Sequence, residues 1–292
     1  MPVRIGAVFP QTEIGPDSAA VRAYAEGVRE LGFAHLMAYD HVLGADRDTH
    51  THLIGPYRVE DQFHEILVLF GYVAAILPGL ELVTGVVIAP QRQTALLAKQ
   101  AAEIDLLTGG RFRLGLGIGW NDVEYEALGM DFTNRGRRFE EQIELLRRFW
   151  TEPVFDYQGR WHTVTAAGIN PLPVQQPIPI WIGGSAERAL QRAARTADGF
   201  FPQRPLEGGW DATLERMRGW AEEAGRKWKT FGIDQRVAIG EGGPDDWRAA
   251  AEEWIARGAT HITLVSSGAG YESPDEHVDR LREGRLALAG LY

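Results

Sequence analysis

The chain of 292 residues contains no cysteine. This absence excludes disulfides, thiolate zinc sites, iron–sulfur clusters and a cysteine nucleophile. The sequence also lacks an apolar run near the ~20 residues that a membrane-spanning helix needs. No basic segment followed by an apolar one precedes the first strand-like run at residues 4–9. We therefore expect a cytoplasmic protein that does not bind a membrane.

The sequence has fewer basic than acidic residues. Thirty lysines and arginines stand against 40 aspartates and glutamates, which gives a formal net charge of −10. This balance disfavours a general nucleic-acid-binding protein, because contact with a phosphate backbone needs a basic surface. A G-x-S-x-G nucleophile elbow is also missing, which disfavours a serine hydrolase.

Strand-like and helix-like segments alternate along the whole chain. The predicted strands cover residues 4–9, 34–39, 80–89, 112–116, 178–182, 199–201, 235–239 and 261–265. The predicted helices cover residues 18–31, 61–77, 93–107, 133–151, 185–196, 206–228, 245–257 and 274–288. This alternation is typical of the α/β class and predicts a (β/α)8 TIM barrel that forms a single domain over residues 1–292.

Two connections are longer than a barrel requires. Residues 41–60 form a polar loop after the second strand. Residues 153–177, after the fourth strand, combine a hairpin pattern at 155–162 with a proline-rich crossing, and we interpret them as an insertion. The helix predicted at 61–77 has little polar surface, which favours a subunit contact and hence a homodimer.

The glycine-rich stretch at 108–121 ends the fourth strand with Gly115, Gly117 and Gly119. It is not a dinucleotide fingerprint, because the third glycine of G-x-G-x-x-G would be position 120, which is Trp120, and no clear helix start follows. The glycines either form a tight turn or let backbone approach a flat or phosphorylated molecule.

Two further strand ends carry candidate chemistry, since barrel enzymes place their sites at the carboxyl ends of the strands. Gly183-Gly184-Ser185 precedes a helix and is typical of an anion site, although Ser185 could also serve only as a helix cap. Asp40-His41 directly follows a strand, where His41 could exchange a proton near neutral pH or could be a surface loop residue.

His50 and His52 form an H-x-H pair of the kind used by metal-dependent barrel hydrolases. The pair lies in the middle of a loop, and none of the later histidines follows a predicted strand, so we predict no metal ligand. Three tryptophans lie near the proposed active face and could line a pocket for a planar ring, namely Trp120, Trp161 and Trp181.

Four segments together carry a family resemblance: residues 31–42, 80–130, 135–152 and 177–201. Their order and spacing are similar to those of the bacterial luciferase-like superfamily of flavin- and deazaflavin-dependent oxidoreductases. Within it, the chain most resembles the subgroup that uses coenzyme F420, a 5-deazaflavin.

The resemblance implies a cofactor at the carboxyl ends of the strands, with a non-proline cis peptide within residues 84–87 behind its central ring. It implies that His41 is the acid/base, and that Asp40 contacts the ring or a hydroxyl group. Some relatives carry a glutamate as a second acid/base in the region of Trp120. The implied cofactor-binding residues are Asp40, Thr84, Gly85, Val86, Gly117, Gly119, Trp120, Asn121, Ile182, Gly183, Gly184 and Ser185.

The leading hypothesis is an oxidoreductase that transfers a hydride between coenzyme F420 and a small organic substrate, with loops 41–60 and 153–177 covering the substrate side. The alternative is an FMN-dependent monooxygenase. A flavin-binding barrel without activity and a metal-dependent hydrolase that uses His50 and His52 are the remaining hypotheses.

Overall fold

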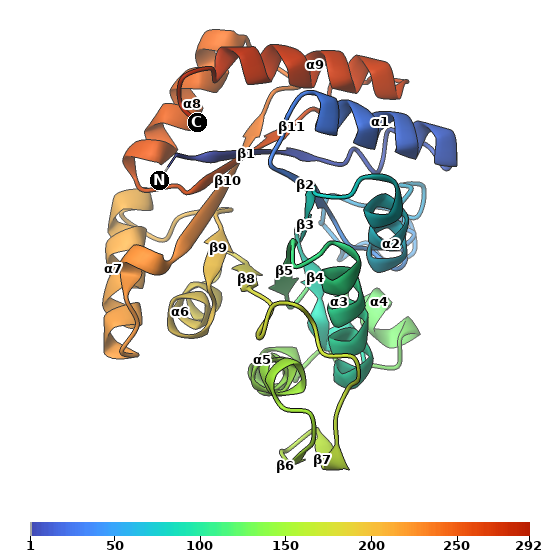
Figure 1. Cartoon of the computed structure of the whole chain (residues 1–292), viewed down its shortest axis with the longest axis vertical. Coiled ribbons are helices and arrows are strands. Elements are labelled where there is room, and N and C mark those ends of the chain that lie inside the picture. The colour runs from blue at the N-terminus through green and yellow to red at the C-terminus, as the bar shows by residue number, and fades with distance from the viewer. Residues whose placement is uncertain (1) are drawn as a thin grey trace.

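Nine short parallel strands form a closed barrel, with helices around its outside (Figure 1). The computed structural model describes residues 2–292. The barrel strands are β1 (Arg4–Val8), β2 (His35–Ala38), β3 (Glu81–Thr84), β4 (Val87–Ile88), β5 (Phe112–Gly117), β8 (Ile180–Gly183), β9 (Gly199–Phe201), β10 (Gly232–Ala238) and β11 (His261–Val265). Their order is β3-β2-β1-β11-β10-β9-β8-β5-β4, and an additional β3–β5 pairing closes the barrel.

Strands β3 and β4 are two halves of one barrel strand, so the barrel has the eight positions that the sequence predicts. Both halves pair with β5, β3 through Leu82 and Val83 and β4 through Val87 and Ile88. The interruption falls at a cis peptide bond between Gly85 and Val86. The non-proline cis peptide that the resemblance implies within residues 84–87 is therefore present.

The helices outside the barrel bury one side against the strands, as amphipathic helices of an α/β barrel do. They are α1 (Ser18–Glu30), α2 (Ile66–Ile76), α3 (Thr94–Leu107), α4 (Asp122–Ala127), α5 (Arg135–Thr151), α6 (Glu187–Thr196), α7 (Gly209–Glu223), α8 (Pro244–Ala256) and α9 (Pro274–Ala287), with short 3-10 turns η1 (Ala89–Gln91) and η2 (Trp228–Thr230).

Polar side chains that cap helices explain two of the differences between the predicted and observed helix starts. Helix α2 begins at Ile66 rather than at residue 61, since the Glu65 carboxylate accepts a hydrogen bond from the N–H of Val68. Helix α4 does follow the glycine-rich strand directly, contrary to our expectation, because the Asn121 side chain accepts a hydrogen bond from the N–H of Glu124.

The insertion at 153–177 lies elsewhere than expected. It contains the hairpin of β6 (Phe155–Gln158) and β7 (Thr163–Ala167), which projects beside α5 in Figure 1. At its tip His162 bonds Glu141 of α5 and Thr94 of α3, at 2.7 Å each. The insertion follows a helix, so it packs on the outer helices and contributes no residue to the cavity described below.

Helix α2 keeps part of its apolar surface exposed, with Val68 72% accessible. The homodimer expected from this helix therefore remains a prediction. Over residues 2–292, none of the helices combines the length and apolar character needed to span a membrane.

An ion-pair network lies inside the barrel. The Arg113 guanidinium on β5 is 2.9 Å from the Asp234 carboxylate on β10 and 3.2 Å from that of Glu81 on β3. It also lies 4.4 Å from the ring centre of Trp181. Burial raises the pKa of the Asp234 carboxyl, while the charge of Arg113 opposes this effect. The positive charge of Arg113 therefore compensates the negative charge of the Asp234 carboxylate, which is buried away from water.

We predict that Arg113→Met lowers the free energy of unfolding by about 3 kcal/mol or more, because it leaves Asp234 buried without its partner. Urea unfolding measures this loss. Arg111→Met, at an exposed position of the same segment, is the control and should change stability by less than about 0.5 kcal/mol. The double variant Arg113→Met/Asp234→Asn should lose less than the sum of the single variants. A loss in Arg113→Met no larger than in the control would contradict the role given to this network.

Candidate active site

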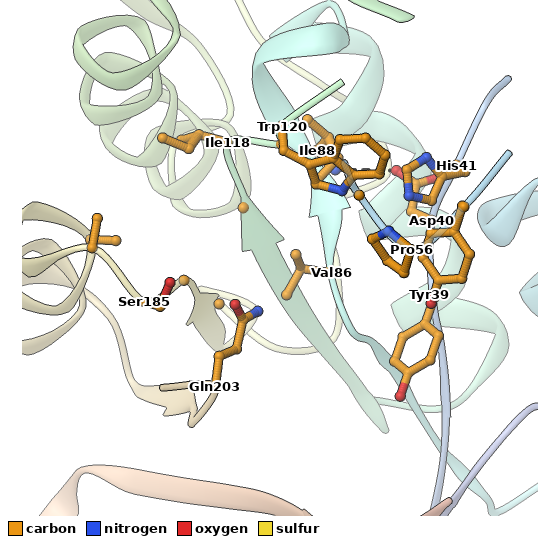
Figure 2. A pocket seen from close by; sticks show the side chains of 18 of the residues that line it. Tyr39, Asp40, His41, Pro56, Val86, Ile88, Ile118, Trp120, Ser185 and Gln203 are labelled. Carbon is orange, nitrogen blue, oxygen red and sulfur yellow. Dashed lines mark hydrogen bonds between the residues drawn. The ribbon is translucent and has the colours of Figure 1, made fainter. Parts of the chain in front are cut away.

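A cavity of about 870 Å³ opens at the carboxyl ends of the strands. Its wall is made by the residues that follow β2, the β3–β4 interruption, and the ends of β5, β8 and β9. The loop after β2 covers one side through residues 52–57. Figure 2 shows Val86 in the middle of this cavity, with His41 and Trp120 on one side and Ser185 and Gln203 on the other.

Ten of the residues implied by the resemblance line this cavity: Asp40, His41, Gly85, Val86, Gly117, Gly119, Trp120, Gly183, Gly184 and Ser185. Three do not. Thr84 is fully buried and donates its hydroxyl to the Gly115 carbonyl at 2.7 Å, Asn121 caps α4, and Ile182 is buried in the wall. Whether any of these residues binds a cofactor is still a prediction.

The three glycines at the end of β5 have different roles. A Cβ on Gly115 would lie 1.8 Å from the Thr84 carbonyl oxygen, so this glycine allows β3 and β5 to approach each other. Gly117 and Gly119 instead line the cavity. Only the last two glycines therefore leave backbone open to a bound molecule.

Val86 occupies a cradle between two glycines of neighbouring strands. A Cβ on Gly117 would lie 2.6 Å from one of its methyl groups, and a Cβ on Gly183 would lie 3.0 Å from the other. Any side chain at these two positions would fill the space on either side of Val86. The surface around Val86 therefore carries no other side chain at these two positions, which suits a flat ring that lies against Val86.

His41 stands at the edge of the cavity inside a group of aromatic rings. Its imidazole makes edge contacts with Tyr57, Phe63 and Trp120 at centroid distances of 4.9, 5.0 and 5.8 Å. Its side chain is 10% exposed. This packing gives the imidazole one orientation, which the surface-loop alternative would not require.

Glu124 of α4 is the residue that sequence reasoning missed. Its carboxylate lies 3.5 Å from Nδ1 of His41. It also accepts hydrogen bonds from the N–H of Val42 at 2.6 Å and from the side chain of Gln91 at 2.8 Å. With Nδ1 beside this carboxylate, Nε2 is the ring nitrogen left to exchange a proton with a bound molecule.

The Glu124 carboxylate is ionised at neutral pH. Burial raises its pKa, but hydrogen bonds from His41, Gln91 and the Val42 N–H outweigh burial, so its pKa lies below the ordinary value. A sequence signal existed in the N-x-x-E pattern of Asn121 and Glu124, which is typical of a helix start.

Trp120 closes the cavity next to His41. A Cβ on Gly55 would lie 2.1 Å from the Trp120 ring, so the tryptophan packs directly against the loop after β2. Trp120 thus occupies the region where some relatives carry an acid, while the acid nearest His41 is Glu124, four residues further on. The other two tryptophans lie elsewhere, Trp181 inside the barrel and Trp161 on the outer hairpin.

The Asp40 side chain forms its hydrogen bonds with other residues of the protein. Its carboxylate accepts hydrogen bonds from Arg92 at 2.7 Å and from the N–H of Ile88 at 3.1 Å. Arg92 also pairs with Glu65 at 2.9 Å. Asp40 therefore ties the end of β2 to β4 and the start of α2, which positions His41 beside it.

The H-x-H pair does not assemble a ligand set. His52 bonds the Asp122 carboxylate at 3.0 Å, and the rings of His50 and His52 are 6.1 Å apart. Within residues 2–292, no group of three or more histidine, aspartate or glutamate side chains is arranged to hold a metal ion.

The far end of the cavity lies at the N-terminus of α6, as the sequence pattern of an anion site predicts. Gly184 and Ser185 follow β8, and α6 begins two residues later at Glu187. The first N–H groups of a helix point away from it and carry partial positive charge, which favours a phosphate. The N-cap residue of α6 is Ala186, so Ser185 is not the cap of this helix.

The pattern that describes luciferase-like monooxygenases matches residues 4–289 of this chain. The chain belongs to this family. An uncharacterized protein of Mycobacterium bovis is 37% identical over 56% of either chain. The FMNH2-dependent dimethylsulfone monooxygenase of Pseudomonas putida is 31% identical over 68% of this chain and 54% of its own length. The luciferase-like chain thus spans about half the length of these two relatives.

A solved structure with the same fold is an F420-dependent secondary alcohol dehydrogenase in complex with an F420-acetone adduct. It has a TM-score of 0.78 and 15% sequence identity, and the match covers 99% of both chains. This luciferase-like protein is therefore similar in sequence to an FMNH2-dependent enzyme, while structures of both F420- and FMN-binding enzymes share its fold.

We predict that Glu124→Gln lowers the free energy of unfolding by about 1–2 kcal/mol at pH 7, because charge-assisted hydrogen bonds to Glu124 are lost. A carboxyl whose pKa is lowered by folding stabilises the protein above its ordinary pKa of 4.5 and loses this effect as the pH falls through the folded value. The difference between wild type and variant should therefore shrink as the pH falls below 4.5.

Urea unfolding at several pH values measures this difference. Glu126→Gln is the matched control, because Glu126 is an exposed glutamate of the same helix. A Glu124→Gln difference that stays constant with pH would show that Glu124 contributes only packing.

Proposed function

We propose that this luciferase-like protein is an oxidoreductase that transfers a hydride between coenzyme F420 and a small organic substrate. The observation that carries the proposal is the position of His41. Its imidazole lies at the edge of the cavity, close to the Val86 cradle, with Nδ1 3.5 Å from an ionised carboxylate. Oxidation of an alcohol releases a proton together with a hydride, so it needs a positioned base of this kind.

The residues of the cavity fit a deazaflavin. Gly117, Val86 and Gly183 offer a surface without bulky side chains for the ring. Gly184 and Ser185 offer the α6 N-terminus to the phosphate. The volume of about 870 Å³ is within the usual range for cofactor and ligand pockets and leaves space for a small substrate.

The bound deazaflavin ring would supply the hydride chemistry. In alcohol oxidation, Nε2 of His41 takes the proton of the substrate hydroxyl, and in ketone reduction it returns a proton to the carbonyl oxygen. The Glu124 carboxylate stabilises the resulting imidazolium and keeps Nδ1 protonated. Trp120 and the loop at 52–57 cover the substrate side and exclude water from the reacting atoms.

We expect the purified protein to bind F420 at least about tenfold more tightly than FMN, which corresponds to ~1.4 kcal/mol. Fluorescence titration measures both affinities. Gly183→Ala should weaken binding of F420 about tenfold, because its Cβ would lie 3.0 Å from Val86. Gly71→Ala is the control, since no atom lies within 4 Å of a Cβ there. Tighter binding of FMN than of F420 would overturn the proposal.

We predict that His41→Gln reduces turnover with F420 by about 100-fold or more, since general acid–base catalysis contributes 10²–10⁴-fold. The loss of deazaflavin absorbance with a panel of short alcohols measures turnover. F420 affinity should change less than about threefold, because His41 is assigned to the proton and not to cofactor binding. His50→Gln, at a histidine of the same loop that does not line the cavity, should keep its activity. Full turnover of His41→Gln would remove the acid/base role.

An FMN-dependent monooxygenase is the second candidate. It is favoured by the 31% identity to the FMNH2-dependent dimethylsulfone monooxygenase. Supplying reduced FMN and oxygen with dimethylsulfone distinguishes the two candidates, because only a monooxygenase couples oxygen consumption to an oxygenated product.

A further inference from the structure

A positively charged side chain lies on the inner side of the barrel, where the cavity meets the strands. Arg236 is on β10, two residues after Asp234, whose carboxylate faces the inside of the barrel. Because alternate residues of a strand share a face, Arg236 also points inward, closer to the carboxyl ends of the strands. It lines the cavity there together with Tyr39, and its guanidinium lies 5.9 Å from the Tyr39 ring centre.

The guanidinium of Arg236 has no carboxylate partner in the part of the chain that the structure describes. Its side-chain hydrogen bond, to the Pro202 carbonyl, is long at 3.4 Å. The carboxylates of Asp40 and Asp122, which line the same cavity, are paired with other side chains. Asp234, on the same strand, is also paired elsewhere. Arg236 therefore presents a positive charge to the cavity that the protein does not neutralise.

The surroundings of this charge are mainly apolar. Tyr39 packs with Val86 and Val265 against a buried cluster inside the barrel. The members of that cluster are Val8, Met37, Val83, Trp181 and Phe201. Arg236 itself is partly buried. In such surroundings water screens a charge less than at an open surface, so the guanidinium attracts an anion more strongly than an exposed arginine does.

The charge of Arg236 lies on the same side of the cavity as His41. Tyr57 connects the two, because its ring centre is 4.9 Å from that of the His41 imidazole. Burial raises the pKa of the Tyr57 hydroxyl, and the nearby charge of Arg236 opposes this rise. Figure 2 shows Tyr39 on the His41 side of the cavity and Ser185 on the opposite side. Arg236 is therefore placed towards the proton-exchanging group and away from the end assigned to the phosphate.

We propose that the substrate of this site is a short hydroxy acid, or the matching oxo acid in the reverse direction, and that Arg236 binds its carboxylate. This inference rests on the proposed function and adds to it the class of substrate. A planar guanidinium matches the two oxygens of a carboxylate, so it fixes the orientation of the substrate as well as its position. The hydroxyl group is then held near Nε2 of His41.

The carboxylate takes no part in the reaction. In the oxidation direction, the O–H bond of the substrate breaks and its proton passes to Nε2 of His41. The C–H bond of the same carbon breaks, and its electron pair leaves with the hydride to the oxidised deazaflavin ring. The product is an oxo acid with an unchanged carboxylate. Arg236 therefore determines specificity, because it binds the substrate through a group that does not react.

The test uses pairs of compounds in which a methyl group replaces the carboxylate. Lactate is paired with isopropanol, and β-hydroxybutyrate is paired with sec-butanol. Wild type supplied with F420 should show a kcat/KM at least about tenfold higher for the acid than for the alcohol in one or both pairs, because charge-assisted hydrogen bonds to the guanidinium stabilise only the acid. The loss of deazaflavin absorbance measures turnover.

Variants of Arg236 locate the effect. Arg236→Met should lower kcat/KM for the preferred acid about 30-fold or more and change that of the matched alcohol less than about threefold. Arg236→Lys keeps the charge but loses the planar pair of donors, so its loss should be smaller. Arg29→Met, at an exposed arginine near the end of α1, is the control and should behave as wild type. The F420 affinity of each variant shows whether the cavity is intact.

Turnover of the alcohols without a preference for the acids would overturn the carboxylate assignment and leave the proposed function intact. An equal loss for acid and alcohol in Arg236→Met would overturn it as well. Absence of turnover of all four compounds with F420 would count against the proposed function. Calorimetric titration of the purified protein with the two acids then tests the assignment alone: binding at least about tenfold weaker in Arg236→Met supports it, whereas equal binding or none to wild type overturns it.

Discussion

The Glu124 carboxylate is the contact on which the candidate active site depends. It joins α4 to the loop after β2 through the N–H groups of Val42 and Leu43, and to η1 through Gln91. The same carboxylate faces Nδ1 of His41. Because these donors come from two separate segments, residues 41–43 and η1, one buried charge fixes both the shape of the cavity wall and the orientation of the imidazole. A neutral side chain in its place could satisfy only part of this set of donors.

The barrel supports this arrangement because the residues that stabilise it lie below the residues that line the cavity. Below the cavity, Arg113 pairs with Asp234 and Glu81 inside the barrel, and Arg4 also pairs with Glu81. Above them, glycines replace side chains where β5 and β8 face Val86, which leaves backbone accessible. Gly115 belongs to the lower level, because it serves the contact between β3 and β5. The same glycine-rich strand therefore closes the barrel through Gly115 and lines the cavity through Gly117 and Gly119.

Much of the fold and part of the site could be predicted from local patterns. The eight barrel positions followed from alternating strands and helices, and the cavity contains His41, Gly117 and Ser185 as expected. Thr84 and Ile182 belong to the same strand ends but point away from the cavity. A strand end locates a segment at the active face, whereas the alternation of side chains decides which residues face the ligand.

The sequence by itself determined the barrel, the face that carries the site and the position of His41, because each follows from the order of apolar segments and from the residues at their ends. Only the tertiary structure decided that Glu124 is the partner of His41 and that the hairpin at 155–167 lies outside the cavity. These contacts join segments that are far apart in the chain, and their geometry depends on how helices pack around the closed sheet, which no local pattern records.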